Sequence, residues 1–277
     1  MSGTRPDDEE AFDRVIRHIE DEVPFEPGYY NEAYLGRRIS ARMQRRDADD
    51  HTEYLDILRS DESEREELLD ALTINVTGFF RDPDMWENLV PVLRELTTDH
   101  RQVDAWSAPC ADGREPYSLV MVAEDDPEIT ARRLNVLATD ISEEAIAAAR
   151  AGAYETTRTT DIEDELGPLD SYDPYVEQDG DTFRVRDRVR EQVTFDTHDL
   201  IRDEPESEKD LLLCRNLLIY IDAEYKTPLF QTLRASLRDG GYLVLGKTES
   251  VPPDCRDAFE PVAKRSRIYR HVGDGGG

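Results

Sequence analysis

The chain has 277 residues, which is enough for two domains with buried cores. Its formal net charge of -29 comes from 63 acids against 34 bases, and this balance argues against nucleic-acid binding, which normally requires a basic surface. No apolar stretch approaches the roughly 18 residues that span a bilayer, and the N-terminus lacks an apolar signal core, so we expect a cytoplasmic protein with no membrane insertion.

The acidic composition also bears on the environment of the protein. Only four of the basic residues are lysines, and self-repulsion of this size is screened when the Debye length shrinks to about 3 Å at 1 M salt. We interpret the chain as one from a halophilic, salt-accumulating prokaryote; the alternative is an ordinary acidic mesophilic protein. The cysteines stand at unrelated spacings and the histidines are scattered, so we expect neither a disulfide framework nor a metal site.

The first part of the chain has the period of helices. We expect residues 1–9 to be disordered and residues 10–72 to form a helical N-terminal domain, with breaks at residues 24–27 and 47–50. Apolar residues such as Phe12, Val15, Ile16 and Ile19 recur at helical spacing. Residues 73–101 are predicted to be connecting helices, and they place Asn75, Thr77 and Arg81 within two helical turns.

From residue 102 the period changes to strands that alternate with helices. Strands are predicted at 103–108, 134–139, 210–214 and 241–245, and helices at 115–124, 142–151 and 224–237. This alternation predicts an α/β domain over residues 102–271 with a parallel, doubly wound sheet. Between about 167 and 195 the rhythm breaks, and residues 182–185 and 192–195 are expected to be antiparallel strands of a small β insert. Residues 272–277 read as a disordered tail.

Two segments carry an unusual density of polar and aromatic residues. Asn75, Thr77 and Arg81 stand beside Phe79 and Phe80, a set that can grip a ligand with a carboxylate, an amine and a planar ring. The stretch 105–118 reads as strand, glycine-bearing loop and helix start, which presents backbone N–H groups to a nucleotide-like ligand. We therefore predict an enzyme with a small charged cofactor.

The ends of the predicted strands supply further candidates. Gly113 is the only glycine of its loop, so a G-x-G-x-x-G fingerprint is absent and a nicotinamide or flavin enzyme is disfavoured. Asp140 ends the next strand, where an acid can accept hydrogen bonds from ribose hydroxyls; alternatively it is a helix N-terminal acid. Glu115 could hold a cationic amine or could simply pair with the helix dipole.

Polar residues also follow the later strands. Arg215 and Asn216 come directly after an apolar run, at the edge where open α/β sheets bind ligands, and Asp199-Leu200 could offer an adenine-edge contact. Taken singly, each of these could also be an ordinary loop residue.

A basic run is the other outlier of the sequence. Five arginines stand without an acid between Ala33 and residue 46, and an apolar stripe at four-residue spacing leaves several of them on exposed faces. The run can neutralise neighbouring acids, or it can dock an acidic helix. The docking candidates are Arg37, Arg38, Arg42, Arg45 and Arg46.

Four ordered motifs resemble the CheR family, the chemotaxis receptor glutamate O-methyltransferases. They are T-x-N-x-T-x-F-F-R at 73–81, W-S-A-x-C-x-x-G-x-E-P-Y-S at 106–118, A-T-D-I-S at 138–142 and C-R-N-x-x-I-Y at 214–220. With the closing 268–270 strand, the resemblance covers about residues 10–271. It implies a Rossmann-like class I methyltransferase core, a helical N-terminal domain that meets the receptor, and a small antiparallel β insert.

The resemblance also implies the cofactor and its contacts. The cofactor is S-adenosylmethionine, with S-adenosylhomocysteine as product and no metal; the implied contacts are Asn75, Thr77, Arg81, Glu115, Asp140, Asn216 and Leu217, with Asp199 and Leu200 near the adenine. At the reactive centre it implies Arg81 and Tyr220, with Arg215 as a weaker candidate. The implied reaction is methyl-ester formation on receptor glutamates; the alternative is an inactive adaptor in a signalling complex.

Two positions depart from the family pattern, and one loop has a length that differs among family members. The loop reads Ala-Asp-Gly-Arg at 111–114 where the family has Ser-Thr-Gly-Glu, and Asp199 stands where many members carry Asn. The segment 177–182 looks like the short form of a loop that is longer in members that bind a tethering peptide of the receptor. We therefore expect the partner to be the cytoplasmic helical region of membrane chemoreceptors, without a C-terminal tether.

Overall fold

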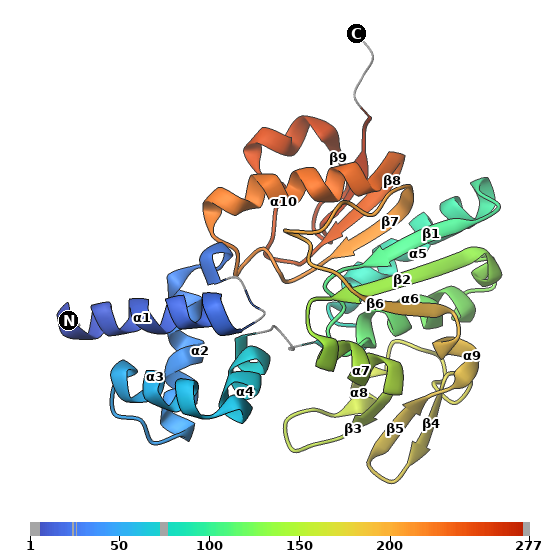
Figure 1. The fold of residues 1–277 in the computed structure, drawn as a ribbon. Coiled ribbons are helices and arrows are strands. Elements are labelled where there is room, and N and C mark those ends of the chain that lie inside the picture. The colour runs from blue at the N-terminus through green and yellow to red at the C-terminus, as the bar shows by residue number, and fades with distance from the viewer. Residues whose placement is uncertain (1–5, 24, 26, 73–76, 274–277) are drawn as a thin grey trace. The chain divides into compact units, whose positions relative to one another are not determined.

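The computed structural model describes residues 6–23, 25, 27–72 and 77–273, except for the side chains of residues 6, 7, 9 and 70. The chain divides into two compact units. The helical unit consists of Met1–Ile74 with Tyr220–Tyr225, and the α/β unit consists of Asn75–Ile219 with Lys226–Gly277. Figure 1 shows the elements of each unit.

The helical unit is built from amphipathic helices with polar caps. Its elements are α1 (Pro6–Glu22), the 3-10 turn η1 (Pro27–Tyr29), α2 (Glu32–Arg45), α3 (His51–Ser60) and α4 (Glu62–Leu72). The side chain of Asn31 accepts from the Tyr34 N–H and caps α2, and Asp50 caps α3. Helices with a break at 47–50 are therefore confirmed, but α1 already begins at Pro6, so the expectation that residues 6–9 are disordered is wrong.

A short segment from late in the chain completes this unit. Ile221 forms a β-bridge with Tyr30, and the Asp222 N–H donates to the Tyr29 carbonyl over 2.8 Å. The rings of Tyr34 and Tyr220 lie 4.7 Å apart, and Tyr220 packs against the helical core. The sequence patterns gave no sign that residues 220–225 would join the first unit.

The α/β unit has a seven-stranded sheet in the order β6-β2-β1-β7-β8-β10-β9. Its strands are β1 (Val103–Ser107), β2 (Leu134–Asp140), β6 (Val193–Thr197), β7 (Lys209–Cys214), β8 (Leu237–Leu245), β9 (Phe259–Ala263) and β10 (Ile268–His271). The pairs from β6 to β8 are parallel, whereas β10 is antiparallel to both of its neighbours. The carboxyl ends of β2, β1 and β7 therefore meet at one edge.

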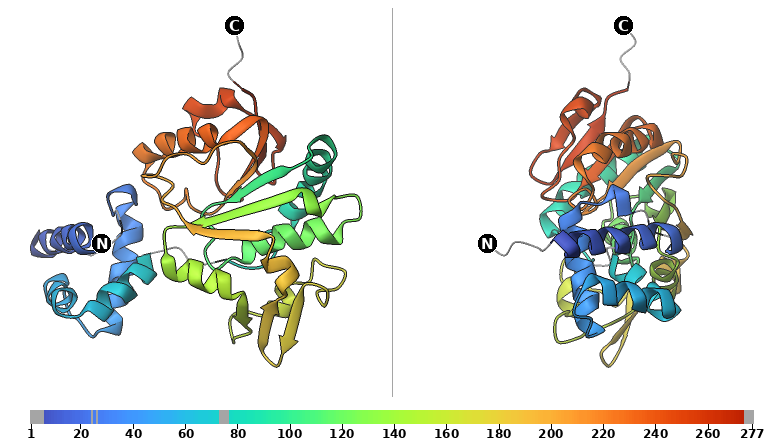
Figure 2. Two further views of the ribbon diagram at one scale, coloured as in Figure 1. Left: turned by 45° about the vertical axis from the view of Figure 1, so that its right-hand side comes forward. Right: turned by 60° about the vertical axis from the view of Figure 1, so that its left-hand side comes forward.

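Helices cover both faces of this sheet, as Figure 2 shows. They are α5 (Pro83–Asp99), α6 (Arg114–Asp125), the 3-10 turn η2 (Ala131–Arg133), α7 (Glu143–Ala151), α10 (Ala223–Ser236) and the 3-10 helix η3 (Pro253–Ala258). The Ser142 hydroxyl accepts from the Ala145 N–H and caps α7, as predicted, while Gly152 ends that helix with a φ of 56°. The predicted α/β core with a helical N-terminal domain is confirmed.

The β insert differs from the expectation. A separate antiparallel sheet has the order β3-β5-β4, with β3 (Ala153–Glu155), β4 (Val176–Asp179) and β5 (Thr182–Val185), and α8 (Ile162–Glu165) and α9 (Asp187–Arg190) lie in the same part of the chain. The prediction that residues 192–195 belong to the insert is wrong, because β6 pairs in parallel with β2 at the edge of the main sheet. A short apolar run reads alike in both settings, so the pattern could not separate them.

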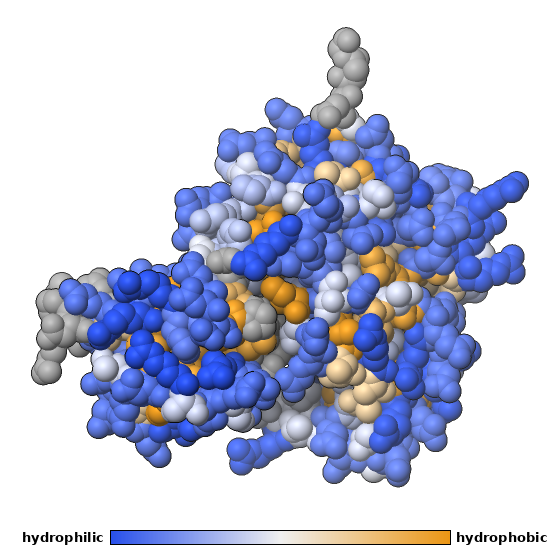
Figure 3. All heavy atoms as spheres, viewed as in Figure 1, coloured by the Kyte–Doolittle hydropathy of each residue, from blue (hydrophilic) through white to orange (hydrophobic). Residues whose placement is uncertain are grey.

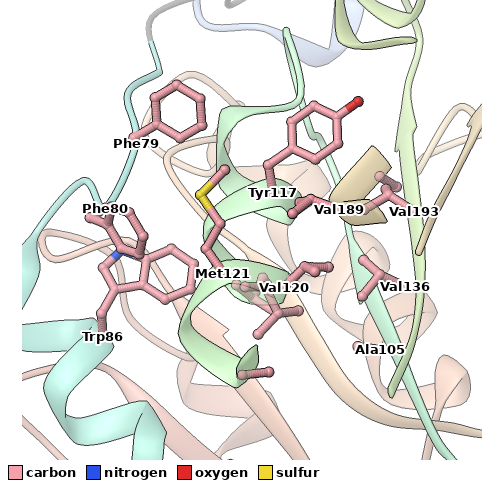
Figure 4. Packing of buried hydrophobic residues seen from close by; sticks show 14 of the residues in the cluster. Phe79, Phe80, Trp86, Ala105, Tyr117, Val120, Met121, Val136, Val189 and Val193 are labelled. Atoms are coloured by element: carbon pink, nitrogen blue, oxygen red, sulfur yellow. The ribbon is translucent and has the colours of Figure 1, made fainter. Parts of the chain in front are cut away.

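The core of the α/β unit is apolar and closely packed. Figure 4 shows Phe80 beside Trp86, whose ring centroids are 5.8 Å apart, and Met121 and Val120 on α6. On the face drawn in Figure 3, hydrophilic residues cover most of the surface. Within the described ranges, no helix is both long and apolar enough to cross a membrane.

Candidate functional site

A buried ion pair joins the ends of β1 and β7. Arg215 follows β7 and is only 5% exposed, and its Nη1 lies 2.8 Å from Oε2 of Glu115 in the first turn of α6. The Ser107 hydroxyl donates to Oε1 of the same carboxylate over 2.9 Å. Burying an unpaired charge costs several kcal/mol, so the ion pair between Arg215 and Glu115 stabilises both side chains in their buried positions.

The same guanidinium holds the segment before α5. Nη2 of Arg215 donates to the carbonyl of Arg81 over 3.0 Å and lies 2.7 Å from Oδ2 of Asp82. The geometry makes Arg215 a positioning residue that links three segments, whereas a direct catalytic role stays a prediction.

Residues 77–82 do not form the helix that the sequence suggested. They run as turns, with Phe80 and Asp82 in the left-handed region at φ values of 48° and 58°. Their backbone is held instead by side chains: the Phe80 N–H donates to the Ser118 hydroxyl over 3.0 Å, and the Trp86 indole donates to the Arg81 carbonyl over 3.2 Å. Thr77 is half-buried, and Asn75 lies outside the described residues.

Asp140 lies where the sequence placed it, at the carboxyl end of β2. Its carboxylate accepts the N–H of Ala111 over 2.9 Å and that of Ser142 over 3.1 Å. Burial raises the pKa of Asp140, although these two N–H donors act against that rise. The backbone N–H of Ile141 also acts on this carboxylate, so about one of its roughly four acceptor positions stays open for a hydroxyl donor.

Gly113 makes the loop beside Asp140 possible. Its φ is 88°, and a Cβ there would lie 2.9 Å from the Cβ of Ala149, too close for any other residue. The single glycine of the loop thus lets α6 begin against α7.

The loop that departs from the family pattern is tied down by an ion-pair network. The Arg114 guanidinium lies 2.9 Å from Asp112 and 3.1 Å from Glu165 of α8, and it stacks over the Tyr154 ring. Glu165 also accepts the Phe79 N–H over 2.9 Å. The arginine therefore connects this loop to the segment at 77–82, and no sequence signal pointed to Glu165.

Glu249 is a site residue that the sequence analysis missed. It is 3% exposed, and its carboxylate accepts the N–H groups of Asn216, Leu218 and Gly246 over 2.9, 2.7 and 2.6 Å. These bonds hold Asn216 in the left-handed region at a φ of 61°. Burial raises the pKa of Glu249, with the N–H donors opposing the shift. In the sequence, the only sign of this residue is that an acid stands three positions after Gly246, which directly follows the last strand residue, Leu245.

Asp199 and Leu200 lie in the loop after β6. Oδ1 of Asp199 accepts the Ile201 N–H over 2.8 Å, and Leu200 is buried, as is Leu217 in the loop after β7. The Asp199 carboxylate thus stabilises the loop in which it lies. The adenine contact stays a prediction for both residues, with Leu200 as its apolar part.

Tyr220 is described within the helical unit. Asn31 donates to its carbonyl through Nδ2 over 2.8 Å, and its ring meets that of Tyr34. Its place at the reactive centre stays a prediction.

The arginine run on α2 contains two different groups. Arg42 is 6% exposed, and its guanidinium meets buried Glu64 at 2.6 Å and Glu67 at 3.0 Å, so the prediction that Arg42 lies on an exposed face is wrong. Arg46 is exposed but pairs with Glu64 and Asp61. The reason is that α4 brings acids to this side of α2, and the sequence run alone could not show that.

The other arginines of the run point away from this network. Arg37 and Arg45 are exposed, and Arg38 is half-buried, with its guanidinium 5.4 Å from the centre of the Tyr34 ring. The docking hypothesis stays a prediction for these three residues.

The sheet edge can hold a charged, ribose-bearing cofactor. Asp140 offers acceptors, Leu200 and Leu217 offer apolar surface, and the loops at Gly113 and Asn216 are rigidly held.

Over the part of the chain that the structure describes, no group of three His, Cys, Asp or Glu side chains could bind a metal ion.

Comparison with known proteins gives matches over both units. The model of the "CheR methyltransferase, SAM binding domain" matches residues 75–268, and that of the "CheR methyltransferase, all-alpha domain" matches residues 10–73. A chemotaxis protein methyltransferase of Listeria monocytogenes is 33% identical over 89% of this chain and 92% of its own length. Chemotaxis protein methyltransferase 1 of Pseudomonas aeruginosa is 34% identical over 68% and 70%.

Solved structures are more distant. A TehB-like SAM-dependent methyltransferase from Corynebacterium glutamicum covers 69% of this chain and 94% of its own, at 15% identity and a TM-score of 0.37. That similarity is too low to support an argument.

Proposed function

The chain belongs to the CheR methyltransferase family, and from this premise we propose that it methylates glutamate side chains of chemoreceptors in chemotaxis adaptation. The products are glutamate methyl esters and S-adenosylhomocysteine. The observation that carries the proposal is the meeting of matched motifs at one sheet edge, where Glu115, Asp140 and Arg215 come from different strand ends.

The residues of this edge fit S-adenosylmethionine. The acceptor position that stays open on Asp140 suits a ribose hydroxyl, and it lies beside the loop that Gly113 allows. Leu200 and Leu217 supply apolar surface for an adenine ring. Asn75 and Thr77 stay proposed contacts by family resemblance.

The reaction needs little from the protein beyond orientation. Bound S-adenosylmethionine supplies a methyl group on a positively charged sulfur. A substrate glutamate is already ionised at neutral pH, because its reference pKa is about 4.3, so no strong general base is required. Arg81 and Tyr220 are the proposed positioning residues for the incoming carboxylate, and excluding water from the reacting charges supplies much of the rate.

Recognition of the receptor is assigned to the helical unit. We propose that Arg37, Arg38 and Arg45 of α2 dock the acidic face of a receptor helix, because among the described side chains no acid of α4 pairs with them. The β4–β5 hairpin turns through Gly180 and Asp181 alone, which supports recognition without a tether peptide. The site of action is the cytoplasm, and the net charge favours a salt-accumulating one.

Transfer of labelled methyl groups tests the proposed function. Receptor-containing membranes are incubated with the protein and methyl-labelled S-adenosylmethionine, and the label is then released with mild base as methanol. Base-labile label on the receptor band supports a carboxyl methyl ester. Binding of the cofactor without any transfer would favour the inactive adaptor instead.

A further inference from the structure

A pocket with an unusual charge lies in the α/β unit beside the candidate site. It has a volume of about 760 Å³, and it lies between the N-terminus of α5, the end of β8 and the turn that joins β9 to β10. Five basic residues line it against two acids, Asp82 and Asp84. Such a balance is the reverse of the whole chain, in which 63 acids face 34 bases.

Arg215 pairs with Asp82 and Glu115, but three other basic residues of the pocket have no acidic partner in the described part of the chain. Among the described residues, no ion pair engages Lys247, Lys264 or Arg265, and all three are exposed. Several arginines elsewhere pair with acids, as Arg238 does with Asp210 at 2.8 Å, whereas others, such as Arg37 and Arg101, are exposed and have no ion pair among the described residues. Cations left unpaired around one hollow, in so acidic a protein, are available to a ligand.

Other pockets of the described residues lack this character. One of about 600 Å³ beside α8 is lined by five acids and by no basic residue. Another of about 630 Å³, at the amino ends of β1 and β2, is lined by three acids and two bases. Positive charge therefore distinguishes the pocket at the carboxyl edge from these two.

The basic pocket is continuous with the site. Arg215 lines it, and the same guanidinium holds the Arg81 carbonyl and the Glu115 carboxylate. The Nε of Arg215 is buried and has no hydrogen-bond partner within the described part of the chain.

The turn that carries the charges is firmly anchored. The Ser266 hydroxyl donates to the Asp84 carbonyl and accepts from Asn88, so the turn is fastened to α5. Arg267 donates to the Lys247 carbonyl, while its own carbonyl accepts the Leu245 N–H. Lys264 and Arg265 therefore project from a fixed frame, which lowers the entropy lost when they bind.

We propose that this basic pocket binds an acidic segment of the substrate protein, the segment that carries the methyl-accepting glutamate. The inference rests on the proposed function and adds a recognition site to it. Salt screens the long-range field of a chain with net charge -29, so an acidic segment must be held by positive charge at contact distance, and this pocket supplies such charge near the reacting edge. Arginine suits this task because its forked donors pair with carboxylates in fixed geometry.

The test reverses the two exposed charges of the turn. Lys264→Glu with Arg265→Glu should raise the KM for receptor about tenfold or more and change kcat little, because docking is lost while the reacting groups stay in place. Affinity for S-adenosylmethionine, measured by calorimetry, should not change. The matched control is Arg101→Glu with Arg132→Glu, which alters net charge equally at exposed positions near the amino ends of β1 and β2.

The outcomes separate the inference from the function on which it rests. If wild-type protein methylates receptors and the turn variant has an unchanged KM, or the control rises as much, the basic pocket is not the docking site. If wild-type protein methylates no receptor, the proposed function is wrong. A direct binding measurement then tests whether the pocket binds an acidic segment. The probe is then a fluorescein-labelled oligoglutamate peptide: binding lost in the turn variant but kept in the control supports the pocket, and equal binding overturns it.

Discussion

Single side chains at this site act mainly by holding backbone in place. Glu249 accepts three N–H groups, Glu165 accepts that of Phe79, and Asp140 accepts two while keeping an acceptor position open. Hydrogen bonds to charged groups contribute about 1.5–3 kcal/mol each, so carboxylates of this kind can fix loops that have few apolar contacts. Preorganisation of this sort lets the site bind a charged ligand without rearrangement.

The first prediction concerns Asp140. Asp140→Ala should weaken S-adenosylmethionine binding by about 1.5–3 kcal/mol, because a charge-assisted hydrogen bond to the ribose is lost. Burial raises the pKa of Asp140, so wild-type affinity should also decline as the pH falls through that raised pKa, a decline that the variant should lack. Isothermal calorimetry across a pH series measures both effects.

A control separates ribose binding from loosening of the loop. Asp140 also holds the N–H of Ser142, so the alanine variant disturbs the start of α7. Ser142→Ala removes the cap of α7 and should cost about 1 kcal/mol of stability, yet it should leave cofactor affinity nearly unchanged. Equal loss of affinity in both variants would contradict the ribose assignment.

At the level of elements, periodicity and caps located most helices and strands. The Ser142 cap was readable because a helix start has its own local chemistry. The assignment of β6 was wrong because a short apolar run does not show which strand it pairs with. The helix expected at residues 77–82 was wrong because distant residues replace the helical hydrogen bonds: the Ser118 hydroxyl accepts the Phe80 N–H, and Arg215 donates to the Arg81 carbonyl. The pairing of Glu64 with Arg42 could not be predicted either, because it depends on how α4 packs against α2.

The second prediction concerns the buried network between α2 and α4. Burial alone would raise the pKa of Glu64, but hydrogen bonds from Arg42 and Tyr54 outweigh it and lower that pKa. Arg42→Met should therefore destabilise the helical unit by about 3–5 kcal/mol, because the buried Glu64 carboxylate loses its closest cationic partner and keeps only the exposed Arg46 at 3.0 Å. Urea unfolding followed by circular dichroism measures this loss, and Arg37→Met, at an exposed position, should change stability by less than about 0.5 kcal/mol.

The pH dependence of this stabilisation has a definite sign. A lowered pKa in the folded state stabilises above the ordinary glutamate pKa of about 4.3 and is lost as the pH falls through the lowered value. Wild-type protein should therefore lose its advantage over Arg42→Met in acid. An advantage that persists unchanged at low pH would show that packing, and not the ion pair, is responsible.

The third prediction concerns the docking surface of α2. Reversal of Arg37, Arg38 and Arg45 to Glu should raise the KM for receptor about tenfold or more, with cofactor affinity and melting temperature nearly unchanged. Arg42 is excluded from this set because its loss would destabilise the helical unit. A triple reversal at exposed Arg14, Arg17 and Arg59, on α1 and α3, carries the same charge change and should leave KM unaltered. If the α2 variant has the same KM for receptor as the wild type, these arginines do not dock the receptor.

At the scale of the whole molecule, charge dominates. The excess of acids opposes folding by self-repulsion, and many arginines are consumed in ion pairs on the surface and between elements. Within the described residues, Ile219 and Val262 are the exposed large hydrophobic side chains. A surface so hydrophilic and so acidic suits a crowded, salty solution.

The fourth prediction follows from screening. Thermal stability and methyl transfer should both rise as KCl increases from about 0.1 to 2 M, since the Debye length falls from about 10 Å to under 3 Å over that range. Scanning calorimetry and initial rates on receptor membranes measure the two quantities. A melting temperature that stays flat or falls would contradict adaptation to a salt-accumulating cytoplasm.

The identity of the methylated group tests the central claim most directly. Receptor is incubated with the protein and deuteromethyl-labelled S-adenosylmethionine, digested, and sequenced by tandem mass spectrometry. The account predicts the labelled methyl on glutamate side-chain carboxyls, with label strongly reduced for Asp140→Ala at limiting cofactor. Label on another residue type, or none on a receptor that the protein demonstrably binds, would contradict it.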